Sequence, residues 1–396
     1  MKQCVILVGG KGTRLGELTK NTPKPMLEIN NKPFLLYIIE TIVRYGFTEI
    51  ILLASHANKV LIDYFKKNSY KNCKIKIIVE EEPLGTGGAL VNAFEHLNDS
   101  FFCLNGDSII EGNWLSLVEN FDTNADVVIG LTETNDSSRY GSIEIQNKKI
   151  ISFNEKNESS KSKLINGGIY LLRKSIFKNL KKNFISLEND IFPNIVNSGK
   201  ANGLKIKGFF IDIGTVKSLE YARKRDWQKD KKAVVFDRDG TLNHDEGYTY
   251  KIEDLSWTDG AIDLIKYLNN NNYLVFVATN QAGIAKGKFL ESDMFKFHEN
   301  MQEQLRKVGA HIDKFYYCPF HIEGVVDKYK IDSNDRKPNV GMLQSIYQEW
   351  NLQKSKMIMI GDRDTDIECA EKFKIQGYKY NIKDDIMEFF KNKINF

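Results

Sequence analysis

The chain has 396 residues, a hydrophobic content of 42%, a charged content of 27% and a formal net charge of +4. This length exceeds the size at which one hydrophobic core stops growing, so we expect two globular domains. Basic residues are scattered, which argues against a nucleic-acid surface, and no apolar run approaches the roughly 20 residues of a membrane span.

The five cysteines lie far apart in the sequence. An odd, scattered set predicts reduced thiols. The N-terminus runs directly into a strand and lacks the basic region and cleavage site of a signal peptide. We therefore expect a cytoplasmic protein, and the sequence leaves open whether it forms a homo-oligomer.

Short apolar runs alternate with helical patterns along the chain. In the first half we expect helices at residues 34–45 and 89–96, and strands at residues 4–8, 49–54, 75–79, 101–104 and 127–131. Such alternation is typical of α/β units around a mostly parallel sheet. The pattern restarts at residue 233, after a charged helical stretch at residues 217–232. The sequence thus predicts two α/β domains, each a mostly parallel sheet flanked by helices, at residues 1–228 and 232–396.

The first strand ends in a glycine-rich turn, residues 9–15, that reads GGKGTRL. Backbone N–H groups of such a turn can close on phosphate oxygens. The turn has neither Walker A spacing nor a full dinucleotide fingerprint, because Leu15 stands where a third glycine would be. Lys24 follows between Pro23 and Pro25, which restrict the backbone around it. This arrangement suits either a cation aimed at phosphates or a rigid surface turn.

Two carboxylates follow the ends of later strands. Asp107 comes after the apolar run at 101–104, and Asp212 lies in the sequence FFIDIGT. A loop at residues 82–89, EPLGTGGA, leads into a helix before them. A lone aspartate at a strand end is often a cap, but two of them with a phosphate loop suit Mg²⁺ held by carboxylates and substrate phosphates.

With these motifs in this order, residues 1–225 resemble the sugar-1-phosphate nucleotidyltransferase family, which has a Rossmann-like domain. Four sequences are most similar to the D-glycero-D-manno-heptose 1-phosphate guanylyltransferases: EPLGTGGA, RYG at 139–141, NGG at 166–168 and FIDIGT. Mannose-1-phosphate guanylyltransferases are similar enough to remain an alternative.

The resemblance implies a role for each matching residue. Lys24 would stabilise charge on the α-phosphate while a sugar 1-phosphate attacks GTP and pyrophosphate leaves. The nucleotide would be bound by Gly9, Gly10, Gly12, Thr13, Arg14, Gly85, Thr86 and Gly88. The sugar phosphate would contact Glu155, Lys156, Asn166 and Gly167. Mg²⁺ would be held by Asp107 and Asp212. Where the family often reads Glu-Lys-Pro, this chain has Asn157 in place of the proline.

The second half opens with a strand that runs into FDRDGTL. Asp237 and Asp239 lie two residues apart on an extended segment, and therefore on the same side of it. Further motifs follow in order: TNQ at 279–281, RKP at 336–338 and GDRD at 361–364. The first and last of these follow apolar strand patterns.

This ordered set resembles the haloacid dehalogenase (HAD) superfamily, whose domain is Rossmann-like. Residues 232–380 are most similar to the D,D-heptose 1,7-bisphosphate phosphatases, with histidinol-phosphate phosphatases as the nearest relatives. The resemblance implies that Asp237 is the nucleophile and that Asp239 is the general acid and then the general base.

The same resemblance implies the binding groups of the phosphatase. Lys337 and Thr279 would hold phosphoryl oxygens. Mg²⁺ would be bound by the Asp237 carboxylate, the Asp239 carbonyl and Asp362. Other contacts to the substrate would come from Asn280, Lys286 and Arg336.

Many of these phosphatases carry a structural zinc ion on a loop. In this chain the four ligand positions hold Cys318, Phe320, Ser333 and Asp335, and His321 is one residue out of register. A closed tetrahedral site needs four good ligands. We expect no zinc, and a loop held by packing alone.

Three hypotheses follow. The leading one is a bifunctional enzyme that dephosphorylates heptose 1,7-bisphosphate and converts heptose 1-phosphate to GDP-heptose. The second keeps both chemistries but changes the substrates, for example to mannose 1-phosphate and another sugar phosphate or histidinol phosphate. In the third, one domain is a non-catalytic module that binds nucleotide sugar. The presence of every expected catalytic lysine and carboxylate argues against the third.

Overall fold

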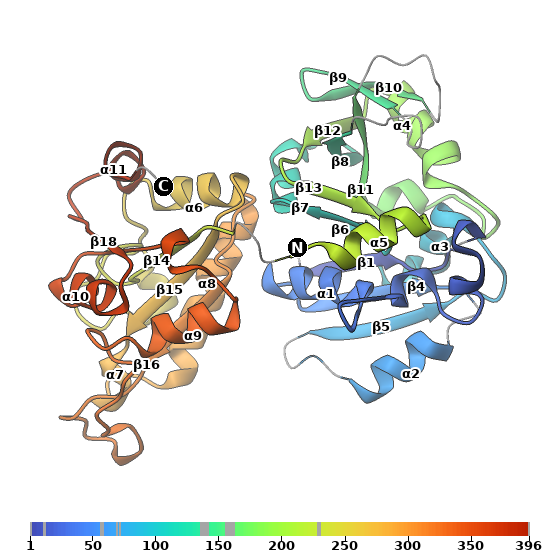
Figure 1. The fold of residues 1–396 in the computed structure, drawn as a ribbon. Helices are drawn as coiled ribbons and strands as arrows, with labels where there is room; N and C mark the ends of the chain where they lie inside the picture. Colours follow the sequence, from blue (N-terminus) through green and yellow to red (C-terminus); the bar gives the residue numbers. More distant parts are fainter. Residues whose placement is uncertain are drawn as a thin grey trace. The chain divides into compact units, whose positions relative to one another are not determined.

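The structure is a computed structural model that describes residues 2–10, 13–55, 59–68, 70, 73–134, 142–154, 163–227 and 231–394. The chain forms two compact units, Met1–Arg225 and Asp226–Phe396 (Figure 1). In the part of the chain that is described, no helix has the length and apolar character needed to cross a membrane.

The first unit is built on a mixed sheet. Within the described residues its nine strands lie in the order β5 (Lys74–Val79), β4 (Glu49–Ala54), β1 (Gln3–Leu7), β6 (Ser100–Asn105), β11 (Leu164–Arg173), β8 (Val127–Glu133), β12 (Ala201–Lys205), β10 (Lys149–Asn154) and β9 (Ser142–Gln146). From β5 to β6 all neighbours are parallel. β11 runs antiparallel to both β6 and β8, and β9 and β10 form an antiparallel pair at the edge.

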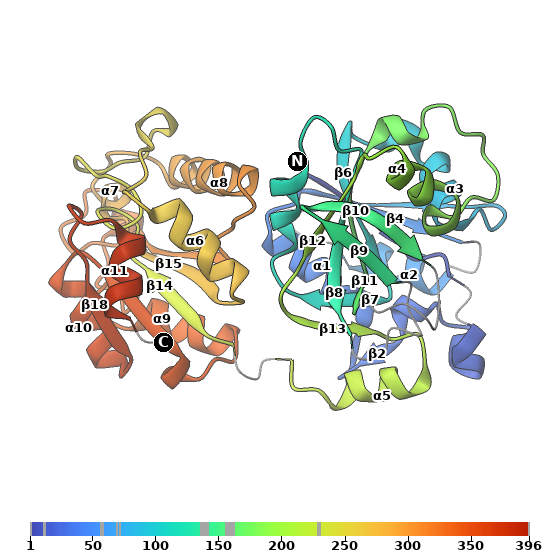
Figure 2. The same ribbon diagram turned by 90° about the horizontal axis from the view of Figure 1, so that it is seen from above.

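Helices cover the faces of this sheet (Figures 1 and 2). They are α1 (Phe34–Arg44), α2 (Lys59–Lys67), α3 (Gly85–Asn92), α4 (Phe192–Asn197) and α5 (Val216–Lys224), with 3-10 helices at Thr13–Thr19, Lys24–Met26, Phe94–His96, Trp114–Asn120 and Lys174–Phe177 and a π-helical turn at Leu187–Ile191. Successive side chains of β6 point to opposite faces of the sheet, so this strand contributes to two hydrophobic cores. Phe101 packs with α3 and α4, whereas Phe102 contacts Phe47 and Trp114.

Two short strand pairs complete the first unit: β2 (Glu28–Ile29) with β3 (Lys32–Pro33), and β7 (Ser108–Glu111) with β13 (Phe209–Asp212). The second pair determines part of a site. Its register sets Asp212 opposite Ser108, and Asp212 therefore comes next to Asp107 although the two are far apart in the sequence.

The second unit is built on a sheet whose described strands are all parallel. Their order is β16 (Lys314–Cys318), β15 (Leu274–Asn280), β14 (Ala233–Phe236), β17 (Met357–Gly361) and β18 (Gln376–Lys379). The helices are α6 (Ala261–Asn270), α7 (Ala282–Ala285), α8 (Glu291–Lys307), α9 (Gly341–Glu349), α10 (Asp364–Phe373) and α11 (Ile386–Lys393), with 3-10 helices at Ile252–Asp254, Asp327–Tyr329 and Lys354–Lys356. A parallel sheet gathers the carboxyl ends of its strands at one edge, where ligands bind in folds of this kind.

The central strand β14 contributes to both cores of the second unit. Val234 and Phe236 pack with α6, α8 and α11, whereas Ala233 and Val235 pack with α9 and α10. All four are fully buried, as expected for a parallel strand covered on both faces.

The predicted α/β architecture is confirmed, and two details differ from the expectation. The first sheet is parallel only in part, because β11, β10 and β9 run against their neighbours. The charged helix expected at residues 217–232 ends at Lys224, and it does have an apolar side, on which Leu219 and Ala222 are buried. Thr215 caps its start by accepting a hydrogen bond from the Ser218 N–H.

Candidate active sites

Asp237 lies at the carboxyl end of β14, in the middle of the second sheet, and is buried. Its Oδ1 accepts a 2.6 Å hydrogen bond from Lys337 Nζ, and the same ammonium lies 2.6 Å from Asp366 Oδ1. Burial raises the pKa of Asp237, and the charge of Lys337 opposes that rise. Burial alone would lower the pKa of Lys337, but Asp237 and Asp366 together raise it. The predicted nucleophile and the predicted phosphate-binding lysine are therefore in direct contact.

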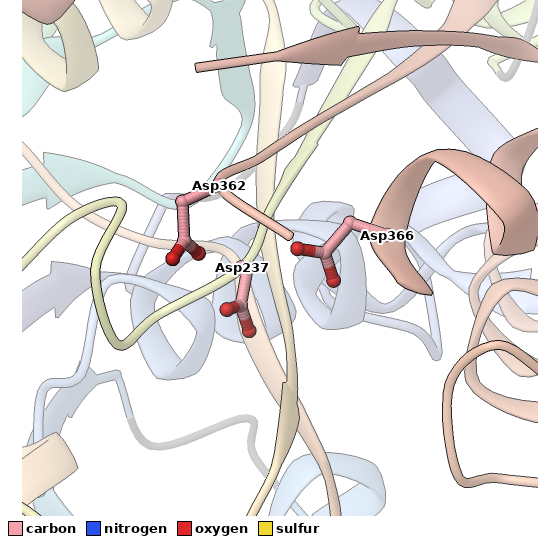
Figure 3. Close-up of side chains that lie close together, drawn as sticks. All are labelled: Asp237, Asp362 and Asp366. Atoms are coloured by element: carbon pink, nitrogen blue, oxygen red, sulfur yellow. The ribbon is translucent and has the colours of Figure 1, made fainter. Parts of the chain in front are cut away.

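Three carboxylates converge at this edge of the sheet (Figure 3). Asp237, Asp362 and Asp366 each offer an oxygen, and these oxygens lie within 4.8 Å of one another. Gly240 has φ +84°, and a Cβ on it would lie 2.6 Å from Asp362 Oδ2, so only glycine lets the loop approach so closely. This all-oxygen set fits a hard divalent cation.

Asp366 is a member of this cluster that the sequence-based prediction missed. It lies in the first turn of α10, four residues after Asp362, and is buried. Its Oδ2 also accepts a 3.1 Å hydrogen bond from the Arg363 N–H. A carboxylate one helical turn after an expected metal ligand is the signal that could have identified it.

Asn280 and Thr279 end β15 beside these groups. Asn280 uses both ends of its amide on the main chain of Lys337, because its Nδ2 donates to the carbonyl and its Oδ1 accepts from the N–H, each at 3.0 Å. This reciprocal pair fixes the position of Lys337. Thr279 is buried and accepts a 2.8 Å hydrogen bond from Gln281 Nε2. Direct contact of Asn280 with substrate stays a prediction.

Asp239 has a different cation as its partner. The Arg238 guanidinium binds both of its carboxylate oxygens, and Gln281 Nε2 donates to Oδ2 at 2.8 Å. The two aspartates of the DRD sequence are therefore held by separate cations, Asp237 by Lys337 and Asp239 by Arg238.

Further positive groups gather near the RKP sequence. Burial lowers the pKa of His321, and nearby Arg336 and Lys286 lower it further. Burial likewise lowers the pKa of Arg336, with Arg363 adding to the effect. Positive charge from several segments, including the predicted contacts Lys286 and Arg336, is thus concentrated where an anionic group would be complementary.

The loop after Cys318, where the sequence departs from the zinc-ligand pattern, is held in part by a carboxylate. Glu291, in the first turn of α8, accepts hydrogen bonds from the hydroxyls of Tyr317 and Tyr329, at 2.7 and 3.0 Å. The ring of Tyr329 also contacts Phe320. The expectation that packing alone holds this loop is therefore wrong, since Glu291 joins β16 and the loop to α8.

In the first unit, Lys24, Asp107 and Asp212 form one cluster. Lys24 Nζ lies 2.6 Å from Asp107 Oδ2 and 3.9 Å from Asp212 Oδ2. Ser108 Oγ donates to Asp107 Oδ1 at 3.0 Å, and the Gly214 N–H donates to Asp212 Oδ1 at 2.6 Å. The two carboxylates have the donor chemistry of a divalent-cation site, and the predicted catalytic lysine lies beside them.

The first glycine loop follows β1. A Cβ on Gly9 would lie 2.9 Å from Glu80 Oε1, whereas a Cβ on Gly10 would meet no heavy atom of the described residues within 4 Å. An added Cβ on Gly9 would therefore press against the Glu80 carboxylate, whereas one on Gly10 would contact none of the described residues. Arg14 is exposed, and Gly12 and the side chain of Thr13 lie outside what the structure describes.

The second glycine loop, at the start of α3, is covered by another segment of the chain. The N–H groups of Gly87 and Gly88 donate to the carbonyl of Ile185. A Cβ on Gly85 would lie 2.6 Å from that carbonyl, and one on Gly88 would collide with the carbonyl of Asn183. Packing thus explains these glycines, and their predicted contact with nucleotide stays a prediction.

The hydroxyl of Thr86 serves the same contact between segments. It donates to Glu188 Oε2 and accepts from the Leu187 N–H, each at 2.8 Å. Thr86 therefore fastens the loop to the residues that follow Ile185, and a role in the nucleotide pocket stays a prediction.

Asn166 and Gly167 lie at an irregularity in β11, where the register with β8 shifts. Asn166 Nδ2 donates to the Tyr170 hydroxyl, and its Oδ1 accepts from the Gly168 N–H. Glu155 and Lys156, the other predicted sugar-phosphate contacts, lie outside the described residues, as does the sequence at 139–141.

Glu80 is a buried carboxylate that the sequence-based prediction missed. It follows β5 and is 5% exposed. Its Oε2 accepts a 2.5 Å hydrogen bond from the Leu84 N–H, while Oε1 faces Gly9. Burial raises its pKa, and the Leu84 N–H opposes the rise. One side chain therefore touches both glycine loops. The sequence does indicate Glu80, because it directly follows an apolar strand. The indication is weak, because Glu80 is the first of three consecutive glutamates.

Comparison with known proteins agrees with this geometry. Residues 3–229 match the nucleotidyl transferase family, and residues 334–380 match the HAD-hydrolase-like family. The D-glycero-alpha-D-manno-heptose 1-phosphate guanylyltransferase of Campylobacter jejuni is 40% identical over 215 residues, which are 54% of this chain and 94% of that protein. The D-glycero-alpha-D-manno-heptose-1,7-bisphosphate 7-phosphatase of Campylobacter jejuni is 43% identical over 139 residues, which are 35% of this chain and 76% of that protein. The D-glycero-beta-D-manno-heptose-1,7-bisphosphate 7-phosphatase of Rhodopseudomonas palustris is 36% identical over 152 residues, which are 38% of this chain and 84% of that protein.

The chain belongs to the nucleotidyl transferase and HAD-like hydrolase families. A solved structure supports the first assignment: HddC from Yersinia pseudotuberculosis, complexed with GMP-PN, is 35% identical, with a TM-score of 0.51 over 57% of this chain and 99% of that one. Both resemblances drawn from the sequence are confirmed. The protein joins a nucleotidyltransferase and a HAD phosphatase, enzymes that generally depend on divalent metal ions.

Proposed function

We propose that this transferase–phosphatase carries out two consecutive steps in the synthesis of a nucleotide-activated heptose. The phosphatase domain, residues 232–396, hydrolyses the 7-phosphate of D-glycero-D-manno-heptose 1,7-bisphosphate. The transferase domain, residues 1–228, transfers GMP from GTP to heptose 1-phosphate and releases pyrophosphate. One observation carries the proposal: the two Campylobacter jejuni relatives are both named for the alpha anomer, and the heptose 1-phosphate that the 7-phosphatase would release is the substrate in the name of the guanylyltransferase.

In the phosphatase, Asp237 attacks phosphorus and becomes an aspartyl phosphate, while Asp239 protonates the departing sugar oxygen. Lys337 and Thr279 hold the phosphoryl oxygens. Asp239 then takes a proton from the water that hydrolyses the intermediate. The distance of 2.6 Å between Lys337 Nζ and Asp237 Oδ1 supports this division of roles.

The groups around these residues complete the phosphatase site. Arg336, Lys286 and Asn280 contact the rest of the substrate. Asp237, Asp362 and the Asp239 carbonyl would hold the metal, Mg²⁺, whose charge would reduce the repulsion between an anionic nucleophile and a phosphate.

In the transferase, the sugar 1-phosphate attacks the α-phosphorus of GTP directly, and no covalent enzyme intermediate forms. Positioning and charge neutralisation provide the catalysis. Lys24 stabilises charge on the α-phosphate, and Asp107 and Asp212 would hold Mg²⁺. The loops at Gly9–Arg14 and Gly85–Gly88 enclose the nucleotide, and Glu155, Lys156, Asn166 and Gly167 contact the sugar phosphate.

Glu80 supports guanine as the base. Guanine presents adjacent N1–H and N2–H₂ donors, and an ionised carboxylate accepts hydrogen bonds only. Uracil and thymine present one N–H between two carbonyls, which a carboxylate would repel. A buried carboxylate that touches both glycine loops and has no ion-pair partner among the described residues is therefore complementary to guanine.

A coupled assay tests the proposal. The purified chain is given heptose 1,7-bisphosphate, Mg²⁺ and each nucleoside triphosphate in turn, and phosphate and pyrophosphate are followed separately. We expect phosphate without nucleotide, and pyrophosphate only with GTP and only after phosphate has been released. Hydrolysis of other sugar phosphates without any attack on the bisphosphate would sink the proposal.

A further inference from the structure

Arg238 lies between the two catalytic aspartates and is fully buried. Its guanidinium binds Asp239 as a fork, with Nε 2.9 Å from Oδ1 and with Nη2 2.9 Å from Oδ2 and 2.7 Å from Oδ1. Two parallel hydrogen bonds of this kind fix the plane of a carboxylate as well as its position. Lysine cannot reproduce them, because its ammonium is a single point of charge.

Arg238 is itself held from three sides. Its Nη2 donates to the Thr249 carbonyl at 2.7 Å, its Nη1 contacts His298 Nε2 at 3.0 Å, and its guanidinium carbon lies 4.7 Å from the centre of the Phe297 ring. A guanidinium has donors only, so His298 Nε2 is the acceptor and the imidazole is neutral. Burial, and then the charge of Arg238, lower the pKa of His298, which agrees with that protonation state. Two of these three contacts, those with Phe297 and His298, come from α8, and they hold the guanidinium against this helix.

Two amides complete the donors around Asp239. Asn243 Nδ2 donates to Oδ1 at 3.1 Å, and Gln281 Nε2 donates to Oδ2 at 2.8 Å. Each carboxylate oxygen therefore has at least two donors, and Oδ1 has Arg238 Nη2 as a third at 2.7 Å. When Asp239 is protonated and one donor is lost, the remaining contacts still hold the side chain in place.

We propose that Arg238 is the positioning residue of the acid–base step, and that its fork, anchored by His298, fixes where Asp239 delivers and accepts a proton. This inference rests on the proposed phosphatase function and deepens it. Asp237 and Lys337 carry out the attack on phosphorus, and Arg238 acts only through Asp239.

The two half-reactions depend on Asp239 differently. In the first, an Asp237 oxygen bonds to phosphorus, the bond from phosphorus to the sugar oxygen breaks, and the proton of Asp239 goes to that oxygen. In the second, Asp239 takes a proton from water, the water oxygen bonds to phosphorus, the bond to Asp237 breaks and phosphate leaves. A leaving group that departs as a stable anion, such as p-nitrophenolate, needs no proton in the first half-reaction.

The experiment therefore compares heptose 1,7-bisphosphate with p-nitrophenyl phosphate in the full chain. Arg238→Lys keeps the charge and removes the fork. We expect its turnover of the bisphosphate to fall by about 10²- to 10⁴-fold, the usual contribution of general acid–base catalysis. The initial burst of p-nitrophenolate, which reports only the first half-reaction, should fall by less than about tenfold. Arg306→Lys, at a second buried arginine near Glu303 and Glu299, is the matched control and should change neither.

His298 provides a second pair of variants that leaves Arg238 in place. His298→Leu removes the acceptor that orients the fork, and His298→Gln replaces it. The leucine variant should show the same dependence on leaving group with a smaller loss, and the glutamine variant should recover activity. This pair decides the question if Arg238→Lys does not fold.

Equal losses for the two substrates in every variant, or no loss in any, would overturn the positioning role. A wild-type chain that releases phosphate from neither substrate would instead overturn the proposed phosphatase function. The two failures are therefore distinguishable.

Discussion

At the scale of single residues, each site places a lysine ammonium among carboxylates. Lys24 lies 2.6 and 3.9 Å from Asp107 and Asp212, and Lys337 lies 2.6 Å from both Asp237 and Asp366. The side chain of Lys24 is 11% exposed and that of Lys337 only 2%. In the proposed mechanism, the lysine ammonium of each site would offset the repulsion that the carboxylates exert on an incoming phosphate.

At this scale we predict that Glu80 determines the preference of the transferase for GTP. Glu80→Gln replaces one of two acceptors with a donor, so one N–H of guanine is left unpaired. We expect kcat/KM for GTP to fall by about 10- to 100-fold, which corresponds to the roughly 1–3 kcal/mol of a buried unpaired donor, and the preference for GTP over UTP to narrow. Pyrophosphate release with each nucleotide measures both. Glu81→Gln, at an exposed neighbour, is the control, and an unchanged preference in Glu80→Gln would refute the assignment.

The residues that could be predicted from the sequence are those next to apolar strands. Asp107, Asp237 and Asp362 follow such strands directly, and a sheet edge brings strand ends together. Asp366 was missed because its partner lies one helical turn away rather than at a strand end. Glu80 was missed because its meaning depends on two loops that meet only in the folded unit.

At the scale of elements, contacts between segments that are distant in the sequence hold loops in place. Glu291 accepts hydrogen bonds from Tyr317 and Tyr329 and so joins β16 and the loop that follows it to α8. The residues around Ile185 cover the glycines that begin α3. Neither contact could be predicted from the sequence, because each joins residues of unrelated motifs.

The Glu291 contact predicts a measurable coupling. Glu291→Leu should lower the free energy of unfolding of the phosphatase unit by about 1–3 kcal/mol, because two hydroxyls lose their acceptor. Tyr329→Phe removes one of the two bonds and should cost about 0.5–1.5 kcal/mol. Denaturant unfolding of the single and double variants forms a double-mutant cycle. Strict additivity of Glu291→Leu and Tyr329→Phe would contradict a direct interaction.

The glycine loops predict two opposite outcomes. Gly88→Ala would collide with the Asn183 carbonyl and should destabilise the transferase unit by about 1–3 kcal/mol. Gly10→Ala meets no atom of the described residues and should leave thermal stability unchanged while reducing pyrophosphate release, since it enters the space expected for nucleotide. Calorimetry and activity together separate a packing glycine from a ligand-facing one. Equal melting temperatures for Gly88→Ala and wild type would contradict the packing argument.

At the scale of the whole molecule, two sites with complete and separate sets of residues predict independence. Asp237→Asn should abolish phosphate release and leave pyrophosphate release from heptose 1-phosphate intact, and Lys24→Met should do the reverse. An equimolar mixture of the two variants should convert the bisphosphate to GDP-heptose, because the intermediate diffuses between chains. If the mixture remains inactive while each variant keeps its own half-reaction, product must pass within one chain.

The position of β14 has a consequence for the synthesis of the chain on the ribosome. β14 is the first strand of its sheet in the sequence but the middle one in space, and its neighbour β17 begins only at Met357. At about 5–20 residues per second, many seconds pass before that neighbour emerges. During this interval the Ala-Val-Val-Phe strand has an open edge of the kind that invites wrong pairing. We therefore expect the phosphatase half to be the part whose yield depends on chaperones and on the speed of translation.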